Sequence, residues 1–369
     1  MRVLIAYKSL PRYRLAFFER LRERLAGDGI ELDLAYGQGT PKDAHRGEEA
    51  ELAWGRRRPN RVLKVGGREL VWQPCLQDVR GADLVVVEQA SRLLLNYVLL
   101  GGQATGLGRV AFWGHGANLQ RQTASAASEW LKRRVSRLPH WWFAYTEGSR
   151  RRVEELGYPA ERITVVQNAQ DTELLAQAVA ALEPARPGDG PVGLFLGSLS
   201  REKRLDFLLD AAERIHRREP RFRLIVAGTG EERPRVEAAA ASRQWITYLG
   251  RVDDLAERAA LLSAADALLV PGLVGLVALD GFAAGVPLVT TAVDFHSPEI
   301  EYVEDGENGL VAREPEDAEA YAELALRAMT PSSFRDRLLD GCRRARRVFT
   351  LEAMVDRFAG GVHAALEAR

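Results

Sequence analysis

The segment GSLSREKR, residues 197–204, places three cations after a short apolar run and before an amphipathic helical pattern. Arg201, Lys203 and Arg204 would lie at the start of that helix, beside main-chain N–H groups that have no partner within it. Such a combination binds anions, above all phosphate. The same residues also fit a solvated helix face without a ligand, so the pattern alone leaves both interpretations open.

The run VPGLVGLVALDGFAAGVPLVTT, residues 270–291, approaches the length of a membrane span but contains four glycines and two prolines. Gly272 and Gly275 let the main chain approach a ligand closely. Residues 275–285 predict a short helix whose N-terminal N–H groups face that ligand. Asp280 in this helix would accept hydrogen bonds from sugar hydroxyls, because a buried carboxylate without partners is costly. We interpret the run as a ligand-binding loop and helix.

Two histidines follow predicted strands. His115 stands between two glycines directly after the strand at 109–113. We expect it to hydrogen-bond a sugar or to carry a proton, with loop stabilisation as the alternative. His296 and Glu299 follow the strand at 287–292 and are expected to contact the sugar or phosphate of the same ligand.

A second group of residues is expected to contact an acceptor. Arg12 or Arg14 would meet a phosphate or an acidic group, although solvated arginines at a helix start explain them equally well. The full predicted acceptor set is Arg12, Tyr13, Arg14, Glu88 and Asn118.

Apolar runs alternate with helical patterns along the whole chain, which predicts parallel sheets covered by helices on both faces. Ligands in such sheets bind beyond the carboxyl ends of the strands. The linker LEPARPGDGP, residues 182–191, separates the halves. Residues 40–70 are charged and poorly periodic and are interpreted as a loop insertion or hairpin. The runs lie at 2–7, 31–37, 83–89, 109–116, 140–149, 163–172, 192–200, 223–230, 245–252, 266–272, 287–293 and 308–312.

Composition narrows the class of protein. The 369 residues fit two domains, and equal numbers of basic and acidic residues, 51 each, argue against a polyanionic partner. Two distant cysteines provide neither a disulfide framework nor zinc spacing and suit a reducing cytosol. The first residues read as a strand rather than a signal peptide. We therefore expect a cytoplasmic protein.

The second half resembles the nucleotide-sugar domain of the GT-B glycosyltransferases, specifically the large retaining family four. The resemblance rests on the order and spacing of VGLFLGSLSREKRLDFLLDAA, RLIVAGTGEE, ITYLGRVDD, LLSAADALLVPG, GLVALDGFAAGVPLVTT and YVEDGENGLV. The first half matches more loosely, chiefly at FAYTEGSRRRVEELGYP and ITVVQNAQDT. The family's paired glutamates, eight positions apart, fall on Gly272 and Asp280. Ser198 replaces the family's arginine in the diphosphate loop, and Lys203 keeps its lysine.

The resemblance implies an α/β protein with two Rossmann-like doubly wound domains facing across a cleft. We expect an acceptor domain at 1–183, a nucleotide-sugar domain at 184–348 and a C-terminal helix at 349–369 that crosses back to the first domain. It further implies sugar transfer from a nucleoside-diphosphate sugar to a hydroxyl of a glycan, glycolipid or small molecule, with retention of configuration. No aspartate-x-aspartate motif stands in a suitable place and the loop at 201–204 is positive, so we expect no metal. The balanced charge argues against nucleic acid.

The resemblance and the strand ends together assign the site residues. His115, Lys203 and Arg201 are expected to be catalytic. The residues assigned to the donor are Gly197, Ser198, Arg204, Gly228, Gly230, Arg251, Val252, Gly272, Val274, Gly275, Leu276, Val277, Asp280, His296 and Glu299.

Three other functions remain open from the sequence. A GT-B nucleotide-sugar epimerase would act without an acceptor, and Gly272 favours a non-catalytic partner subunit. An NAD-dependent enzyme is disfavoured because the full glycine fingerprint is absent. In addition, residues 128–142 combine basic residues with Trp130, Trp141 and Trp142, which predicts either peripheral membrane contact or a solvated basic helix that leads into a buried strand.

Overall fold

A computed structural model describes residues 1–39, 49–66, 68–106, 108–116, 133–183 and 188–368. The chain forms two compact units. The first unit contains residues 1–170 and 351–369, and the second contains residues 171–350. The expected fold class, two doubly wound parallel-sheet domains, is confirmed.

The first unit is built on a seven-stranded sheet in which every neighbouring pair is parallel. Its central strands are buried along almost their whole length, as expected for a sheet covered on both faces, whereas the two-residue edge strand Arg56–Arg57 is exposed. The strand order is β3 (Arg56–Arg57), β2 (Glu31–Gly37), β1 (Arg2–Ser9), β6 (Leu84–Glu88), β7 (Arg109–Gly114), β8 (Trp141–Ala144) and β9 (Ile163–Val165).

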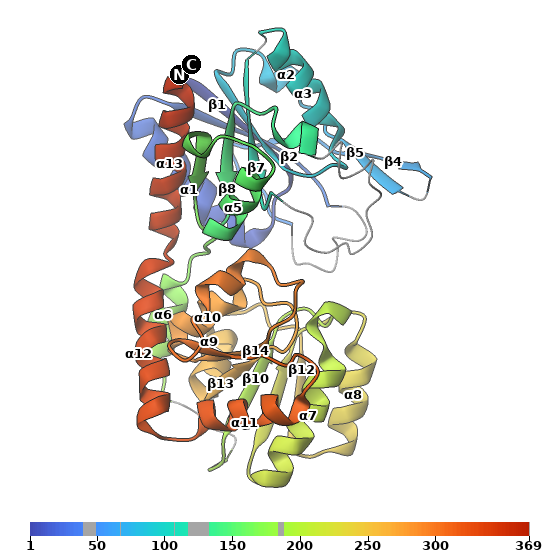
Figure 1. Cartoon of the computed structure of the whole chain (residues 1–369), viewed down its shortest axis with the longest axis vertical. Coiled ribbons are helices and arrows are strands. Elements are labelled where there is room, and N and C mark those ends of the chain that lie inside the picture. Colours follow the sequence, from blue (N-terminus) through green and yellow to red (C-terminus); the bar gives the residue numbers. More distant parts are fainter. Residues whose placement is uncertain (40–48, 67, 107, 117–132, 184–187, 369) are drawn as a thin grey trace. The chain divides into compact units, whose positions relative to one another are not determined.

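Helices cover this sheet, and one of them comes from the end of the chain. Helix α13 (Leu351–Glu367) runs beside α1 (Leu15–Gly27) and packs on β8 and β9 (Figure 1). Phe358 of α13 stacks on Phe143 with ring centroids 4.2 Å apart, which ties the helix to the core of the first unit. The other helices whose bounds lie within the described residues are η1 (Arg12–Arg14), α2 (Leu76–Val79), α3 (Leu94–Ala104), α5 (Glu147–Glu155) and η3 (Ala160–Arg162).

A separate hairpin of β4 (Arg61–Val65) and β5 (Arg68–Trp72) belongs to the first unit but not to its main sheet. It overlaps residues 40–70, the region that the sequence identified as a loop insertion or hairpin, and extends two residues beyond it to Trp72.

The second unit has a six-stranded parallel sheet. The strand order is β12 (Ile246–Gly250), β11 (Arg223–Ala227), β10 (Val192–Leu196), β13 (Ala267–Leu269), β14 (Leu288–Thr291) and β15 (Gly309–Ala312). Numbered within the unit this order is 3-2-1-4-5-6, the dinucleotide-binding arrangement with a switch point between its first and fourth strands.

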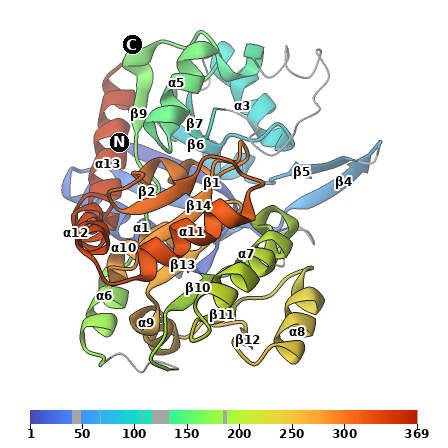
Figure 2. The same cartoon turned by 60° about the horizontal axis from the view of Figure 1, so that its bottom comes forward.

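Helices cover the second sheet as well. Helices α7 (Leu205–Arg218) and α11 (Ala318–Met329) lie side by side (Figure 2). Asp254 and Asp317 cap α9 (Leu255–Ala264) and α11 with their carboxylates, and Ser332 caps α12 (Ser333–Val348) with its hydroxyl. The remaining helices are α6 (Glu173–Ala180), η4 (Arg201–Lys203), α8 (Arg233–Ser242), α10 (Val277–Ala284) and η5 (Pro298–Tyr302).

The boundaries between the units differ from those expected. The change from the first unit to the second falls at 170/171 rather than 183/184, because α6 packs on α9 and α10 of the second unit. The return to the first unit falls at 350/351 rather than 348/349, at the start of α13.

Candidate active site

The switch point of the second unit brings together the segments that follow β10 and β13, because these two strands are neighbours. Gly197 and Ser198 follow β10, and Pro271 and Gly272 follow β13. Two segments distant in sequence therefore meet at the edge where parallel sheets bind ligands.

Glycines shape the neighbouring turns. A Cβ on Gly228 would lie 1.8 Å from the carbonyl oxygen of Gly197, and one on Gly230 would lie 2.4 Å from that of Leu199. Both glycines also have φ near 150°, which disfavours any side chain. These two predicted donor residues therefore let the turns after β10 and β11 pack against each other.

Gly272 lies directly against η4. A Cβ at this position would come 2.1 Å from the carbonyl oxygen of Glu202 and 2.6 Å from the carbonyl carbon of Lys203. The Leu273 N–H donates to the Glu202 carbonyl at 2.8 Å, which fixes this close approach. The position where the resemblance places the missing glutamate thus has no room for a side chain.

The side chain of Lys203 also holds η4 against the loop of Gly272 and Leu273. Its ammonium donates to the Leu273 carbonyl at 2.5 Å, and the residue is only 8% exposed. Burial lowers the pKa of Lys203 to about 8, against the opposing influence of Glu299 and Glu202. Glu299 is buried too, so a cation and an anion face each other inside the unit.

His296 holds the loop rather than a ligand. Its Nδ1 accepts from the Val274 N–H at 3.1 Å, and its Nε2 lies 2.7 Å from the Thr291 carbonyl, to which it donates. Burial lowers its pKa, which agrees with the neutral tautomer that this pattern requires. The expected contact of His296 with the donor is therefore corrected, because both ring nitrogens are used within the protein.

Arg204 and Arg201 differ in how far their guanidinium groups are exposed for binding a ligand. Arg204 donates to the Pro315 carbonyl at 2.7 Å and pairs with Glu316 at 2.7 Å, and its guanidinium lies over Phe207. It thus stabilises the fold, contrary to the donor role expected for it. Arg201 is 83% exposed along its side chain, with a loose 3.8 Å contact to Glu231, and remains the accessible cation.

The N-terminus of α10 offers main-chain donors at this edge. Within the described chain, the N–H groups of Gly275, Leu276 and Val277 have no hydrogen-bond acceptor. A Cβ on Gly275 would meet nothing within 4 Å, so the main chain is open here. Asp280 is buried within α10. Arg251 and Val252 follow β12, and Arg251 pairs with Asp253 at 2.5 Å.

The first unit has a corresponding switch point between β1 and β6. Glu88, at the end of β6, accepts a hydrogen bond from the Lys8 N–H of β1. Burial raises the pKa of Glu88, while the Lys8 N–H and the Lys8 charge oppose the shift. This predicted acceptor residue therefore lies where a ligand of the first unit would bind.

His115 follows β7 at the same edge. Its ring packs on Tyr145 with centroids 4.6 Å apart, and its Nδ1 is buried without a hydrogen-bond partner in the described residues. Burial, followed by the charges of Arg152 and Arg14, lowers its pKa to about 4. His115 is thus neutral near pH 7, and its Nδ1 is a buried polar atom without a partner among the described residues.

The three residues of η1, Arg12, Tyr13 and Arg14, differ in exposure. Arg12 and Tyr13 are exposed, as an acceptor contact requires. Arg14 is fully buried, donates to the Asn168 side chain and lies 5.1 Å over the ring of Trp113. Arg14 therefore holds the segment around Asn168 in place, and the acceptor role expected for Arg14 is corrected. Asn118 lies outside the described residues.

The aromatic residues expected at a membrane are partly core. Trp141 and Trp142 lie in β8 and are buried, and Trp142 donates to the Ser136 carbonyl. They cannot reach a bilayer, whereas Trp130 and Lys132 lie outside the described residues. None of the helices described is long and apolar enough to cross a membrane. Within the described chain no group of three or more histidines, cysteines and acids is placed to hold a metal.

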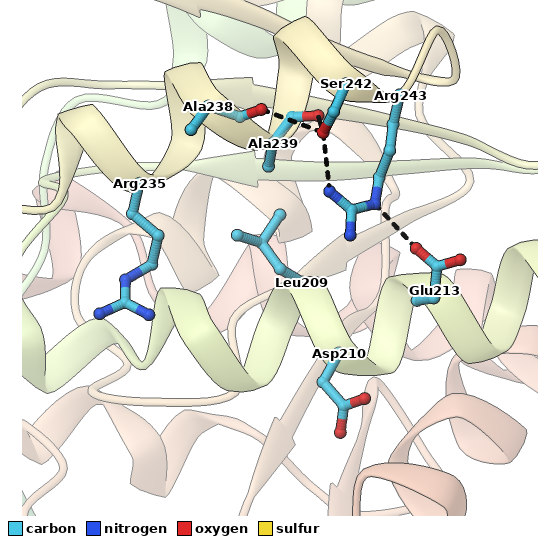
Figure 3. A pocket seen from close by; sticks show the side chains of 8 residues that line it. All are labelled: Leu209, Asp210, Glu213, Arg235, Ala238, Ala239, Ser242 and Arg243. Carbon is cyan, nitrogen blue, oxygen red and sulfur yellow. Dashed lines mark hydrogen bonds and ion pairs between the residues drawn. The ribbon is translucent and has the colours of Figure 1, made fainter.

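A surface hollow of the second unit lies elsewhere, between α7 and α8 (Figure 3). Arg243 pairs with Glu213 at 2.8 Å across it and also donates to the Ser242 hydroxyl. Its residues come from the helices rather than from the strand ends, so the hollow does not belong to the candidate site.

Comparison with solved structures covers nearly the whole chain. Sucrose-phosphate synthase from Thermosynechococcus elongatus superposes with a TM-score of 0.70 at 18% identity, over 98% of both chains. Anabaena HepE in complex with UDP superposes with a TM-score of 0.69 at 15% identity, over 98% of this chain and 100% of HepE. The chain has the GT-B fold.

Sequence comparison adds a family for part of this GT-B chain. Residues 190–330 match the family described as glycosyl transferases group 1. Glycogen synthase of Mycobacterium tuberculosis (strain ATCC 25618 / H37Rv) is 31% identical over 242 residues, which are 63% of this chain and 55% of that protein. D-inositol 3-phosphate glycosyltransferase of Frankia alni is 34% identical over 198 residues, 49% of this chain and 48% of that protein. The chain thus spans about half the length of the relatives it matches.

Proposed function

We propose that this protein transfers a sugar from a nucleoside-diphosphate sugar to an acceptor hydroxyl. The proposal is supported by the β10–β13 switch point, where the segment of Arg201 and Lys203 packs against the loop that leads to α10. We propose that these two cations and the N–H groups at the start of α10 together bind a diphosphate. This site lies within the segment that matches the glycosyl transferases group 1 family. HepE, which shares the fold, has been solved with UDP and with UDP-glucose, which supports a nucleoside diphosphate as the bound group.

The chemistry follows from the leaving group. Departure of a nucleoside diphosphate develops negative charge on its phosphates, and fixed donors aimed at that charge lower the barrier. Arg201, Lys203 and the amides at 275–277 would supply these donors, which makes a metal unnecessary. Asp280 would accept from the ribose hydroxyls. We propose retention of configuration, with attack on the same face assisted by the leaving phosphate.

The first unit would hold the acceptor. Arg12, Tyr13 and Glu88 are proposed to bind a glycan, glycolipid or small-molecule acceptor, and the neutral His115 would accept a hydrogen bond from a sugar hydroxyl. A reducing, cytoplasmic location is part of the proposal. The two cysteines support it, since both are buried free thiols.

The closeness of Gly272 to η4 favours one second candidate, a non-catalytic partner subunit that binds nucleotide without turnover. The loop is built without space for the carboxylate that the resemblance places near the donor sugar. Nucleoside diphosphate binding with no release from any nucleotide sugar would support that candidate over transfer.

The experiment is a screen of nucleotide sugars with glycan, glycolipid and small-molecule acceptors, measured as nucleoside diphosphate release and product mass. With the active pair, His115→Ala should lower kcat about 100-fold or more while nucleotide affinity stays within about twofold. His363→Ala, on α13, is the control and should leave both unchanged. Equal losses of affinity and turnover in His115→Ala would contradict its placement at the sugar.

A further inference from the structure

The hairpin of β4 and β5 extends from the first unit, away from its main sheet, in both views (Figures 1 and 2). Its strands pair antiparallel from Arg61–Trp72 at the base to Val65–Arg68 at the tip. Gly66, with φ of 56°, follows Val65 in the turn, the conformation that tight hairpin turns require. A two-stranded sheet of this size has little stability of its own in water.

Only the base of the hairpin is tied to the rest of the unit. Val71 is fully buried, and its N–H donates to the Arg92 carbonyl at 2.8 Å. Val71 also forms a bridge with Leu93, beside α3. By contrast, every residue of β4 is exposed. The tip is therefore presented to the surroundings by a fixed base.

One face of the hairpin is apolar. Opposite residues of an antiparallel pair share a face, so Leu63 and Leu70 lie together, with Val65 nearer the tip. Leu63 is 49% exposed and Val65 is 58% exposed. Trp72 and Arg61 occupy the same face at the base. Exposed apolar residues that lie together and are bordered by charge are typical of interaction surfaces.

The charge on the hairpin is positive. Arg61 and Lys64 have no ion-pair or hydrogen-bond partner in the described residues, and Glu69 lies across the strands from Lys64 without an ion pair. The nearby Arg56, Arg57 and Arg58 differ, because each forms a salt bridge with an acid of the first unit. The exposed hairpin thus offers cations that the protein itself does not neutralise.

We infer that the β4–β5 hairpin docks this protein on an anionic lipid surface. Val65, Leu63 and Leu70 would enter the boundary of the acyl chains, while Trp72 and Arg61, on the same face at the base, stay at the level of the headgroups, where such side chains are favoured. Lys64 lies on the opposite face of the hairpin and adds its charge to the attraction. Unpaired lysine and arginine attract the negative surface of a leaflet. This surface differs from residues 128–142, and the inference does not depend on the proposed activity.

The positive charge of the hairpin also argues against the docking of a second copy of this chain on it. Pairing of the free edge of β4 with β4 of another chain would bring Arg61 and Lys64 of both copies close together, and like charges across a strand pair are destabilising. A lipid surface with negative headgroups satisfies the same cations.

Co-sedimentation of the full chain with vesicles tests the inference. We expect binding to phosphatidylcholine vesicles that contain phosphatidylglycerol, little binding to phosphatidylcholine alone, and weakening by salt. The double variant Leu63→Asp/Val65→Asp should lose most of the bound fraction. Lys64→Gln should weaken binding roughly fivefold, the effect of removing one basic residue near a charged leaflet.

A matched control separates the hairpin from a general effect of added charge. Leu174 and Leu249 are 59% and 47% exposed, and Leu174→Asp/Leu249→Asp changes the net charge by the same amount. This variant should bind vesicles as the wild type does. Equal loss in both double variants, no binding of the wild type, or a dimer that the hairpin variant abolishes would overturn the inference.

Discussion

Gly272 and Gly275 stand three residues apart in one loop, but their surroundings differ. A methyl group on Gly272 would collide with the main chain of η4, whereas one on Gly275 meets open space. Gly272→Ala should therefore lower the free energy of unfolding by about 1–3 kcal/mol, as overpacking does. Gly275→Ala should leave stability unchanged but weaken nucleotide binding, because the methyl stands where the ligand approaches. Denaturant unfolding and calorimetry measure the two effects; equal stability of both variants would refute the packing of Gly272.

Lys203 makes nucleotide affinity depend on pH. Its pKa of about 8 means that the charged form predominates below pH 8 and is lost above it. If the ammonium binds the diphosphate, affinity is full below pH 8 and falls as the pH rises, by at most about tenfold per unit. In Lys203→Met the affinity should be low and independent of pH over that range. A wild-type affinity that stays constant to about pH 9.5 would show that Lys203 acts through Leu273 alone.

The sequence predicted which segments meet at the switch point better than it predicted the contacts of each side chain. The cations at 201–204 and the glycines at 272 and 275 meet at one switch point, as their places after strands indicated. Arg204 and His296 were assigned to the donor, but their partners, the carbonyls of Pro315 and Thr291, lie elsewhere in the chain. Such long-range hydrogen bonds leave no local pattern, so sequence alone could not reveal them.

Helix α13 lies at the end of the sequence but packs against the core of the first unit. Phe358 stacks on Phe143 and lies within 5.4 Å of Phe17, ring to ring. Phe358→Ala should lower the free energy of unfolding of the first unit by about 3–5 kcal/mol, the usual cost of removing a buried aromatic ring. Glu352→Ala on the same helix removes only an exposed ion pair with Arg20 and should cost less than about 1 kcal/mol. Similar losses in the two variants would contradict the docking of α13.

The strands were predictable as elements because buried parallel strands are continuous apolar runs. The boundary near 170 was not, because α6 joins the second unit through its packing on α9 and α10 rather than through its own composition. The basic segment before Trp141 could not be interpreted from its composition either. Its tryptophans allowed both a membrane contact and a place in the core, and the pairing of β8 with β7 and β9 places Trp141 and Trp142 in the core.

On the scale of the whole molecule, each unit carries one buried thiol. Cys75 belongs to the first unit and Cys342 to the second, and burial raises the pKa of each to about 12. Neither should react with a thiol reagent until its unit opens.

The thiols therefore report where nucleotide binds. A nucleoside diphosphate bound at the β10–β13 switch point stabilises the second unit by mass action. It should slow the labelling of Cys342 under mild denaturant and leave that of Cys75 nearly unchanged, as measured by mass spectrometry of the labelled peptides. Selective protection of Cys75 would place the nucleotide in the first unit and contradict the assignment.

The most direct test is calorimetric titration of the full chain with a panel of nucleoside diphosphates. At least one nucleoside diphosphate should bind with one-to-one stoichiometry. Arg201→Ala and Lys203→Ala should each weaken binding at least about tenfold, the loss expected for one charge-assisted hydrogen bond. Leu174→Asp should bind as the wild type does. If no nucleoside diphosphate binds, or if both alanine variants bind unchanged, the diphosphate site at the β10–β13 switch point does not exist.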